Sequence, residues 1–243
     1  MNHLFTPLLP REPLQAPVLV LAAHPDDEVI GAGGMLAWHA RKGHAVTVVH
    51  MTDGAKGDPN NRESDICAVR RREGKAALER LGLGEPEHWD LADGELPERL
   101  PAVTERLREL FGRVQPRTLY SFWFGEAHRD HRAVAVATAE AAAALPDDCR
   151  CLLFGVNHVV PGGVLFDISD TYPTKYQALK AYASQNAYID LPGMSEHRDR
   201  AATVNLDIGG VLYGEMFADL RPAEMPLCKD RAIALHRMLL RDE

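Results

Sequence analysis

The feature that most constrains this fold is a series of short apolar runs separated by longer mixed segments. Residues 18–23 (VLVLAA) and 45–51 (AVTVVHM) are almost continuously apolar, which is typical of strands buried on both faces of a parallel sheet. Residues 117–122 (RTLYSF) predict a third strand, and residues 88–91 predict a short one. These patterns therefore predict a sheet whose central strands are packed against helices on both faces.

Helical patterns fall between these strands and predict helices over 33–42, 65–81, 98–113 and 132–144. Alternation of strands and helices predicts βαβ units and an α/β, Rossmann-like sandwich with a mostly parallel sheet. A C-terminal elaboration follows, with strands predicted at 152–156 and 164–168 and helices at 175–183 and 225–241. Residues 1–16 read as an irregular, proline-rich arm, and residues 17–243 as a single domain.

Composition narrows the class of protein. The formal net charge of −8 disfavours nucleic acid as a partner. No apolar run approaches the ~20 residues that span a bilayer, and no leader pattern precedes the first strand, so we expect no membrane association. Four cysteines without a C-x-x-C pair suit a reducing compartment, which predicts a cytoplasmic protein. The oligomeric state stays open, a homo-oligomer included.

The first chemical motif is His24-Pro25-Asp26-Asp27-Glu28, directly after the first predicted strand. Ligand sites of α/β folds lie at this end of a strand. An imidazole beside carboxylates is a ligand set that suits Zn²⁺. Acidic residues are also favoured at a helix N-terminus by the helix dipole, but that reading does not explain His24 and Pro25. Spacing alone does not say which aspartate, Asp26 or Asp27, would bind an ion.

The second motif, residues 128–131 (HRDH), follows the strand predicted at 117–122. It supplies two further imidazoles, His128 and His131, and a carboxylate, Asp130, that could orient one of them. Two such clusters at equivalent ends of two strands predict one shared metal site.

Together the two motifs, AHPDDE and HRDH, resemble the LmbE/PIG-L family of zinc-dependent de-N-acetylases, whose members include deacetylases of mycothiol and bacillithiol synthesis. Weaker similarities to the family's later segments occur at residues 70–82, 93–96, 180–185 and 213–217. The resemblance thus spans roughly residues 18–217. It implies the following roles: zinc ligands His24, Asp27 and His131; general base Asp26; His128 facing the scissile carbonyl with Asp130 beside it; and Arg70 and Asp93 holding the substrate.

The expected function is a zinc-dependent hydrolase, an N-deacetylase that removes the acetyl group from an N-acetylglucosamine-type amino sugar or its conjugate. A His₂Asp site also accepts other divalent ions. One alternative is a metal-dependent amidase that acts on a non-sugar N-acyl natural product, a choice that the loops at 52–64 and 157–163 would shape. Another is a binding module without catalysis, which Asp26 disfavours because a binder needs no base. The partner expected in each enzymatic case is a small molecule.

Overall fold

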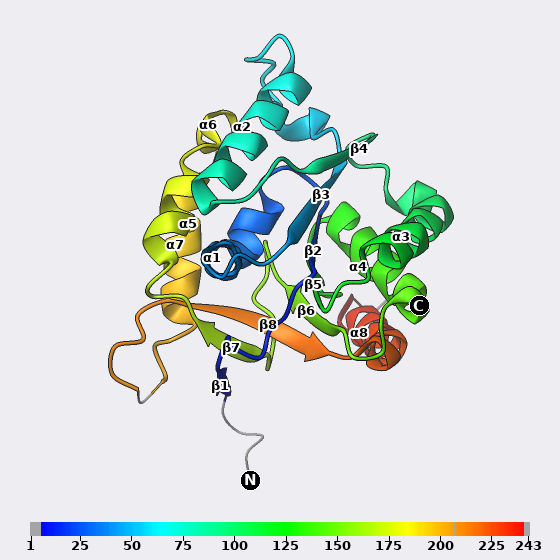
Figure 1. Cartoon of the computed structure of the whole chain (residues 1–243). Helices are drawn as coiled ribbons and strands as arrows, with labels where there is room; N and C mark the ends of the chain where they lie inside the picture. Colours follow the sequence, from blue (N-terminus) through cyan, green and yellow to red (C-terminus); the bar gives the residue numbers. More distant parts are fainter. Residues whose placement is uncertain (1–5, 207, 241–243) are drawn as a thin grey trace.

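The computed structural model describes residues 6–206 and 208–240, which form a mixed eight-stranded sheet flanked by helices (Figure 1). The strand order is β1-β7-β8-β6-β5-β2-β3-β4. The strands are β1 (Leu8–Leu9), β2 (Val18–Ala22), β3 (Val46–Thr52), β4 (Glu87–Leu91), β5 (Thr118–Phe122), β6 (Arg150–Phe154), β7 (Val164–Asp167) and β8 (Gly214–Leu220). The helices are α1 (Asp27–Arg41), α2 (Ile66–Leu81), α3 (Leu100–Val114), α4 (Arg129–Ala141), α5 (Tyr172–Leu179), α6 (Ala183–Asn186), α7 (Leu191–Ala201) and α8 (Met225–Leu240).

The topology confirms the predicted α/β class. All neighbouring strand pairs are parallel except those of β8, which runs antiparallel between β6 and β7. Strand β1 lies within the stretch predicted to be irregular and pairs with β7, so this part of the arm belongs to the sheet. Neither β8 nor α7 is predicted by the sequence pattern.

The helices cover both faces of the sheet. In Figure 1, α1, α2, α5 and α7 gather on one face, whereas α3, α4 and α8 gather on the other. All five residues of β2 are buried, as expected for a central parallel strand between two helical layers. Among the described helices, none combines the length and the apolar character needed to cross a membrane.

Helix α1 packs unusually close to the sheet. A Cβ atom at Gly31 would overlap the Phe154 ring, and one at Gly34 would lie 2.7 Å from the side chain of Ile168. Glycine at these two positions therefore lets the helix backbone approach the neighbouring side chains. The predicted start of this helix at residue 33 is wrong, because α1 begins at Asp27.

A buried charged group anchors the middle of α1. The carboxylate of Glu215, on β8, accepts hydrogen bonds from the backbone N–H groups of Gly34 (2.8 Å) and Met35 (2.9 Å). The ammonium group of Lys175 lies 2.7 Å from the same carboxylate and 2.6 Å from Asp199. Hydrogen bonds and an opposite charge are what a buried carboxylate requires. Strand β8 thereby fixes the helix whose first turn carries the first motif.

Candidate metal and catalytic site

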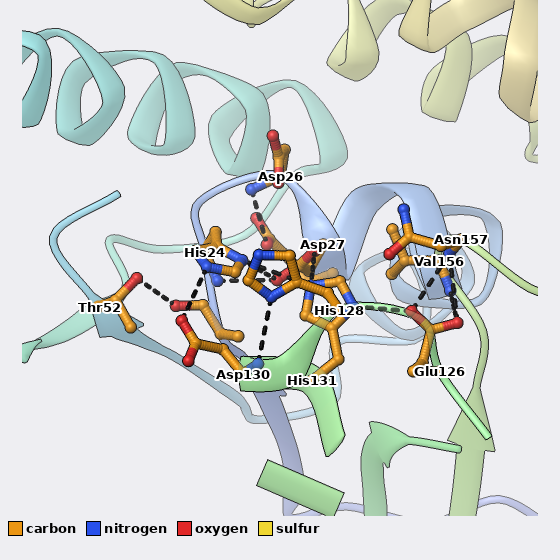
Figure 2. A network of polar contacts seen from close by, with 12 residues as sticks. His24, Asp26, Asp27, Thr52, Glu126, His128, Asp130, His131, Val156 and Asn157 are labelled. Carbon is orange, nitrogen blue, oxygen red and sulfur yellow. Dashed lines mark hydrogen bonds and ion pairs between the residues drawn. The ribbon is translucent and has the colours of Figure 1, made fainter. Parts of the chain in front are cut away.

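The two sequence motifs meet at the carboxyl edge of the sheet. His24 follows β2, His131 lies in the first turn of α4 after β5, and Asp93 follows β4. Strands β4, β3, β2 and β5 are consecutive neighbours in the sheet, so the chain segments that leave them lie side by side. Figure 2 shows the resulting cluster of imidazoles and carboxylates.

The turn between β2 and α1 has an uncommon backbone conformation. Asp26, at the N-cap of α1, has φ 138° and ψ −29°, a conformation that costs free energy for a residue other than glycine. Its backbone N–H donates to Glu28 Oε2 (3.3 Å), and Arg70 donates to the carbonyl oxygen of Pro25 (2.9 Å). These two contacts hold the turn in place and separate the directions in which Asp26 and Asp27 project.

Three of the side chains predicted to bind metal converge on one point. The Oδ1 atom of Asp27 lies 3.1 Å from His131 Nε2, and its Oδ2 atom lies 3.3 Å from His24 Nδ1. The two imidazole nitrogens are 3.4 Å apart. Donor atoms about 2.0–2.2 Å from a tetrahedral zinc ion would be about 3.3 Å from one another. The spacing of these atoms therefore fits a single ion between them.

A carboxylate stands behind each of the two imidazoles. The distant nitrogen of His131, Nδ1, contacts Glu126 Oε2 at 2.7 Å. The distant nitrogen of His24, Nε2, contacts Asp93 Oδ1 at 3.0 Å and Asp130 Oδ2 at 3.3 Å. Carboxylates in this position hold the proton of a metal-binding imidazole on the far nitrogen and fix the orientation of the ring.

This arrangement leaves electron pairs facing one another. When both imidazoles are neutral and their protons are directed at Glu126 and at Asp93, the near nitrogens of His131 and His24 present lone pairs toward the carboxylate of Asp27. Three acceptors at these distances cannot satisfy one another, but they can share a cation. The donor set therefore fits a divalent metal ion.

The pKa directions agree that the cluster attracts positive charge. Burial alone would lower the pKa of His131, but the carboxylates of Asp27 and Glu126 raise it to about 9. Burial also opposes the charged form of His24, yet its contacts with Asp130, Asp27 and Asp93 raise its pKa well above the usual value. Conversely, the two imidazoles outweigh burial and hold the pKa of Asp27 well below its ordinary range.

Asp26 points away from Asp27. Its carboxylate accepts a hydrogen bond from Arg70 on α2 (3.0 Å), and Figure 2 shows the side chain directed toward a neighbouring helix rather than toward the His24 ring. Burial raises the pKa of Asp26 to about 7; Arg70 opposes this shift and Asp27 adds to it. A buried carboxylate whose pKa lies near neutrality is suited to proton transfer. Its role as general base stays a prediction.

His128 is the N-cap residue of α4 and forms one side of the site. Its ring centroid lies 4.7 Å from that of His24 and 4.8 Å from that of His131. Its Nδ1 atom accepts a hydrogen bond from the backbone N–H of Asp130 (3.2 Å), so a neutral ring carries its proton on Nε2. Burial, followed by the nearby His24 and His131 rings, lowers the pKa of His128, which favours this neutral form.

Asp130 lies near His128, but its carboxylate contacts His24 and the backbone of the segment after β4. Besides contacting His24, it accepts hydrogen bonds from the backbone N–H groups of Gly94 (2.6 Å) and Leu96 (3.2 Å). Burial would raise the pKa of Asp130, but the His24 contact and the N–H of Gly94 outweigh it and lower the pKa. The carboxylate thus connects the segment after β4 to an imidazole of the metal cluster.

The structure places Arg70 and Asp93, predicted to hold substrate, against protein groups of the site. Arg70 is 4% exposed and donates to Gly54, Pro25 and Asp26. Asp93 accepts from the backbone N–H of Lys56 (2.9 Å) as well as contacting His24, and these contacts outweigh burial to lower its pKa to about 2. Both residues contact the cluster of imidazoles and carboxylates or the turn that carries it, and contact with substrate stays a prediction.

Sequence reasoning assigned no role to Glu126, although the structure places it directly behind His131. The available signal was its position, two residues before the HRDH motif and four residues after the strand predicted at 117–122. A carboxylate near a candidate metal-binding histidine is worth testing as its hydrogen-bond partner.

The fold and the donor set define an α/β protein with a candidate His/Asp metal centre at the carboxyl edge of its sheet. Comparison with known proteins agrees with this class. The family model described as PIG-L, GlcNAc-PI de-N-acetylase, matches residues 19–142. A probable N-acetyl-alpha-D-glucosaminyl L-malate deacetylase 2 of Bacillus anthracis is 32% identical over 185 residues, which cover 70% of this chain and 81% of that protein. The chain belongs to the PIG-L family of de-N-acetylases.

Solved structures share the fold. N,N'-diacetylchitobiose deacetylase from Pyrococcus horikoshii is 24% identical and matches with a TM-score of 0.75, covering 85% of this chain and 84% of that one. The 4-carboxy-2-hydroxymuconate hydratase from Pseudomonas putida is 25% identical with a TM-score of 0.69, covering 84% and 95%. The same architecture therefore carries both deacetylases and a hydratase.

Proposed function

We propose that this protein is a zinc-dependent hydrolase that removes an N-acetyl group from an N-acetylglucosamine-type amino sugar or its conjugate. The observation that carries the proposal is the convergence of His24 Nδ1, Asp27 and His131 Nε2 within 3.1–3.4 Å of one another. Membership of the PIG-L family and the similarity to a glucosaminyl malate deacetylase support the choice of reaction and of substrate class.

In the proposed mechanism His24, Asp27 and His131 would hold the ion, a set of three protein ligands of the kind found in catalytic zinc sites. A bound zinc ion would supply a water of lowered pKa and a Lewis acid for the amide oxygen. Asp26 accepts the proton of the attacking water, for which its pKa of about 7 is suited. His128 donates a hydrogen bond from Nε2 to the oxygen of the scissile carbonyl. Either Asp26 or His128 then returns a proton to the departing amine.

A direct test is a screen of N-acetylglucosamine conjugates with the metal-loaded protein, using the appearance of free amine as the readout. The proposal expects turnover of at least one conjugate with a small polar or anionic aglycone. Amine release only from non-sugar amides would favour the alternative amidase. Hydration of an unsaturated acid without any amine release would instead place the chain with the hydratase relative.

The first site prediction concerns His128. Replacement by Ala should lower kcat by about 10²–10³-fold, because one oxyanion donor contributes roughly that factor, and should change KM far less. The conservative variant His128→Gln keeps an N–H donor and should retain more turnover than His128→Ala. Steady-state kinetics and metal content measured on both variants provide the check. A change confined to KM would assign His128 to substrate binding instead.

The second concerns Arg70, for which we propose a substrate-anchoring role in addition to its contacts with the Asp26 turn. Loss of those contacts in Arg70→Ala should lower kcat for every substrate. An anchor that pairs with a carboxylate or phosphate should add a further loss of kcat/KM for an anionic conjugate only. Paired measurements on a neutral and an anionic N-acetylglucosamine conjugate separate the two effects. Equal losses on both would remove the anchoring role and leave the positioning role.

A further inference from the structure

Glu126 is a fully buried carboxylate that contacts three backbone N–H donors and one imidazole nitrogen. Its Oε2 atom contacts His131 Nδ1 at 2.7 Å. Its Oε1 atom accepts from the backbone N–H groups of Val156 (3.0 Å) and His158 (3.0 Å), and the N–H of Asn157 lies 3.2 Å from both oxygens. Figure 2 shows Glu126 between His131 and this segment.

The three backbone donors come from consecutive residues of the loop after β6, the strand beside β5. Successive N–H groups that point at one spot form a binding site for an anion. Here the anion is the side chain of Glu126, which enters from the loop after β5. One carboxylate therefore joins the loop of residues 156–158 to the imidazole that faces Asp27.

We infer that Glu126 is a positioning residue that keeps the proton of His131 on Nδ1 and so leaves Nε2 free for the metal ion. The inference rests on the metal site proposed above. It extends that site because the loop of residues 156–158 becomes part of the support for a metal ligand.

A carboxylate can accept from the loop N–H groups with one oxygen and from His131 Nδ1 with the other. The isosteric amide has only one acceptor oxygen and cannot do both. In Glu126→Gln, the amide NH₂ group must face either the three backbone N–H donors or His131. Facing the loop, it opposes other donors and leaves them unsatisfied. Facing His131, it can donate only to Nδ1, which moves the imidazole proton to Nε2, the atom that lies 3.1 Å from Asp27. The first orientation keeps an acceptor at Nδ1 but replaces the charged carboxylate with a neutral oxygen and releases the loop of residues 156–158. The second moves the proton onto the nitrogen that should bind the metal ion. Neither changes the size of the side chain.

The test compares zinc affinity, measured by competition with a chelator, in the wild type and in Glu126→Gln. Loss of a carboxylate behind a metal-binding histidine should weaken zinc binding by about 10–100-fold. The absorption spectrum of the cobalt-substituted protein should change in parallel, because the His131 ligand is altered. Glu73→Gln is the control: it also alters a carboxylate that accepts two hydrogen bonds, from the backbone N–H (2.8 Å) and the hydroxyl (2.6 Å) of Ser184, but one that joins α2 to α6 rather than to a metal ligand. It should lower thermal stability and leave zinc affinity unchanged.

Wild-type zinc affinity in Glu126→Gln would overturn the inference, as would an equal loss in Glu73→Gln. If Glu126→Gln does not fold, ¹⁵N spectra of the zinc-loaded wild type decide the matter, since they report which imidazole nitrogen of His131 carries the proton. A proton on Nδ1 supports the inference, and a proton on Nε2 contradicts it. A wild-type protein that binds no zinc would instead refute the proposed function.

Discussion

Replacement of Asp26 by Asn should leave the metal ion bound and reduce turnover by about 10²–10⁴-fold, the usual contribution of a general base. Asparagine has nearly the same size and can still accept the hydrogen bond that Arg70 donates to Asp26 Oδ2. It cannot take a proton from water. The loss should therefore appear in kcat, with the metal content of the purified variant close to that of the wild type.

Asp65→Asn is a suitable control for this experiment. The Asp65 side chain caps α2 by accepting from the backbone N–H of Ala68, and asparagine caps a helix about as well. The same chemical change should therefore leave turnover unaltered at this position. A near-normal kcat in Asp26→Asn would refute the role of Asp26 as the base. Loss of metal from Asp26→Asn would show that the variant had disturbed the ligand cluster rather than proton transfer.

Replacement of Asp27 by Ala should remove the metal ion and, with it, almost all activity. Asp27 is the carboxylate that both His24 and His131 face, so its removal takes away one of three proposed ligands and the negative charge of the cluster. Because a bound metal ion contributes several kcal/mol to catalysis, turnover should fall by about 10³-fold or more. Metal analysis of the purified variant gives the direct measurement.

His131→Ala should have the same effect on metal content, whereas His44→Ala should not, since His44 contacts His39 away from the site. The fold of all three variants should survive, as judged by circular dichroism, because the core of the sheet contains no ligand residue. Wild-type metal content in both Asp27→Ala and His131→Ala would show that the ion binds elsewhere.

The central strands were predictable because a strand that is buried on both faces consists almost entirely of apolar residues. Strands β2, β3 and β5 are examples, and each lies within two residues of its predicted bounds. Helix α1 was predicted to start too late because carboxylates and glycines occupy its first two turns. The carboxylates Asp27 and Glu28 are favoured by the positive end of the helix dipole. The glycines Gly31 and Gly34 are required by the close packing of the helix on Phe154 and Ile168.

Strand β8 illustrates what the pattern could not reveal. It carries Glu215 and Asp219, whose charges suggest an exposed segment. Their partners, Lys175 and Arg150, belong to distant parts of the sequence and become neighbours only in the folded chain. Hydropathy along one segment contains no information about such a partner, so a buried charged strand is not recognised.

The same limit applies to the site. The family resemblance implied His24, Asp27 and His131 as ligands, a choice between Asp26 and Asp27 that the motifs alone left open, and the structure brings these three together. The contact of Asp93 with His24 depends on β4 lying beside β3, which the sequence does not specify. The Asp130 carboxylate is directed toward the segment after β4, and this contact also depends on the position of β4 in the sheet.

A metal titration shows whether one metal ion bound by this cluster is required for deacetylation. Protein stripped of metal by a chelator is supplied with zinc in steps, and the release of amine and of acetate from an N-acetylglucosamine conjugate is followed. We expect no release without metal, a rise that ends at one equivalent of zinc per chain, and equal amounts of amine and acetate. Amine release by the stripped protein, or none by the protein carrying one zinc ion, would contradict this expectation.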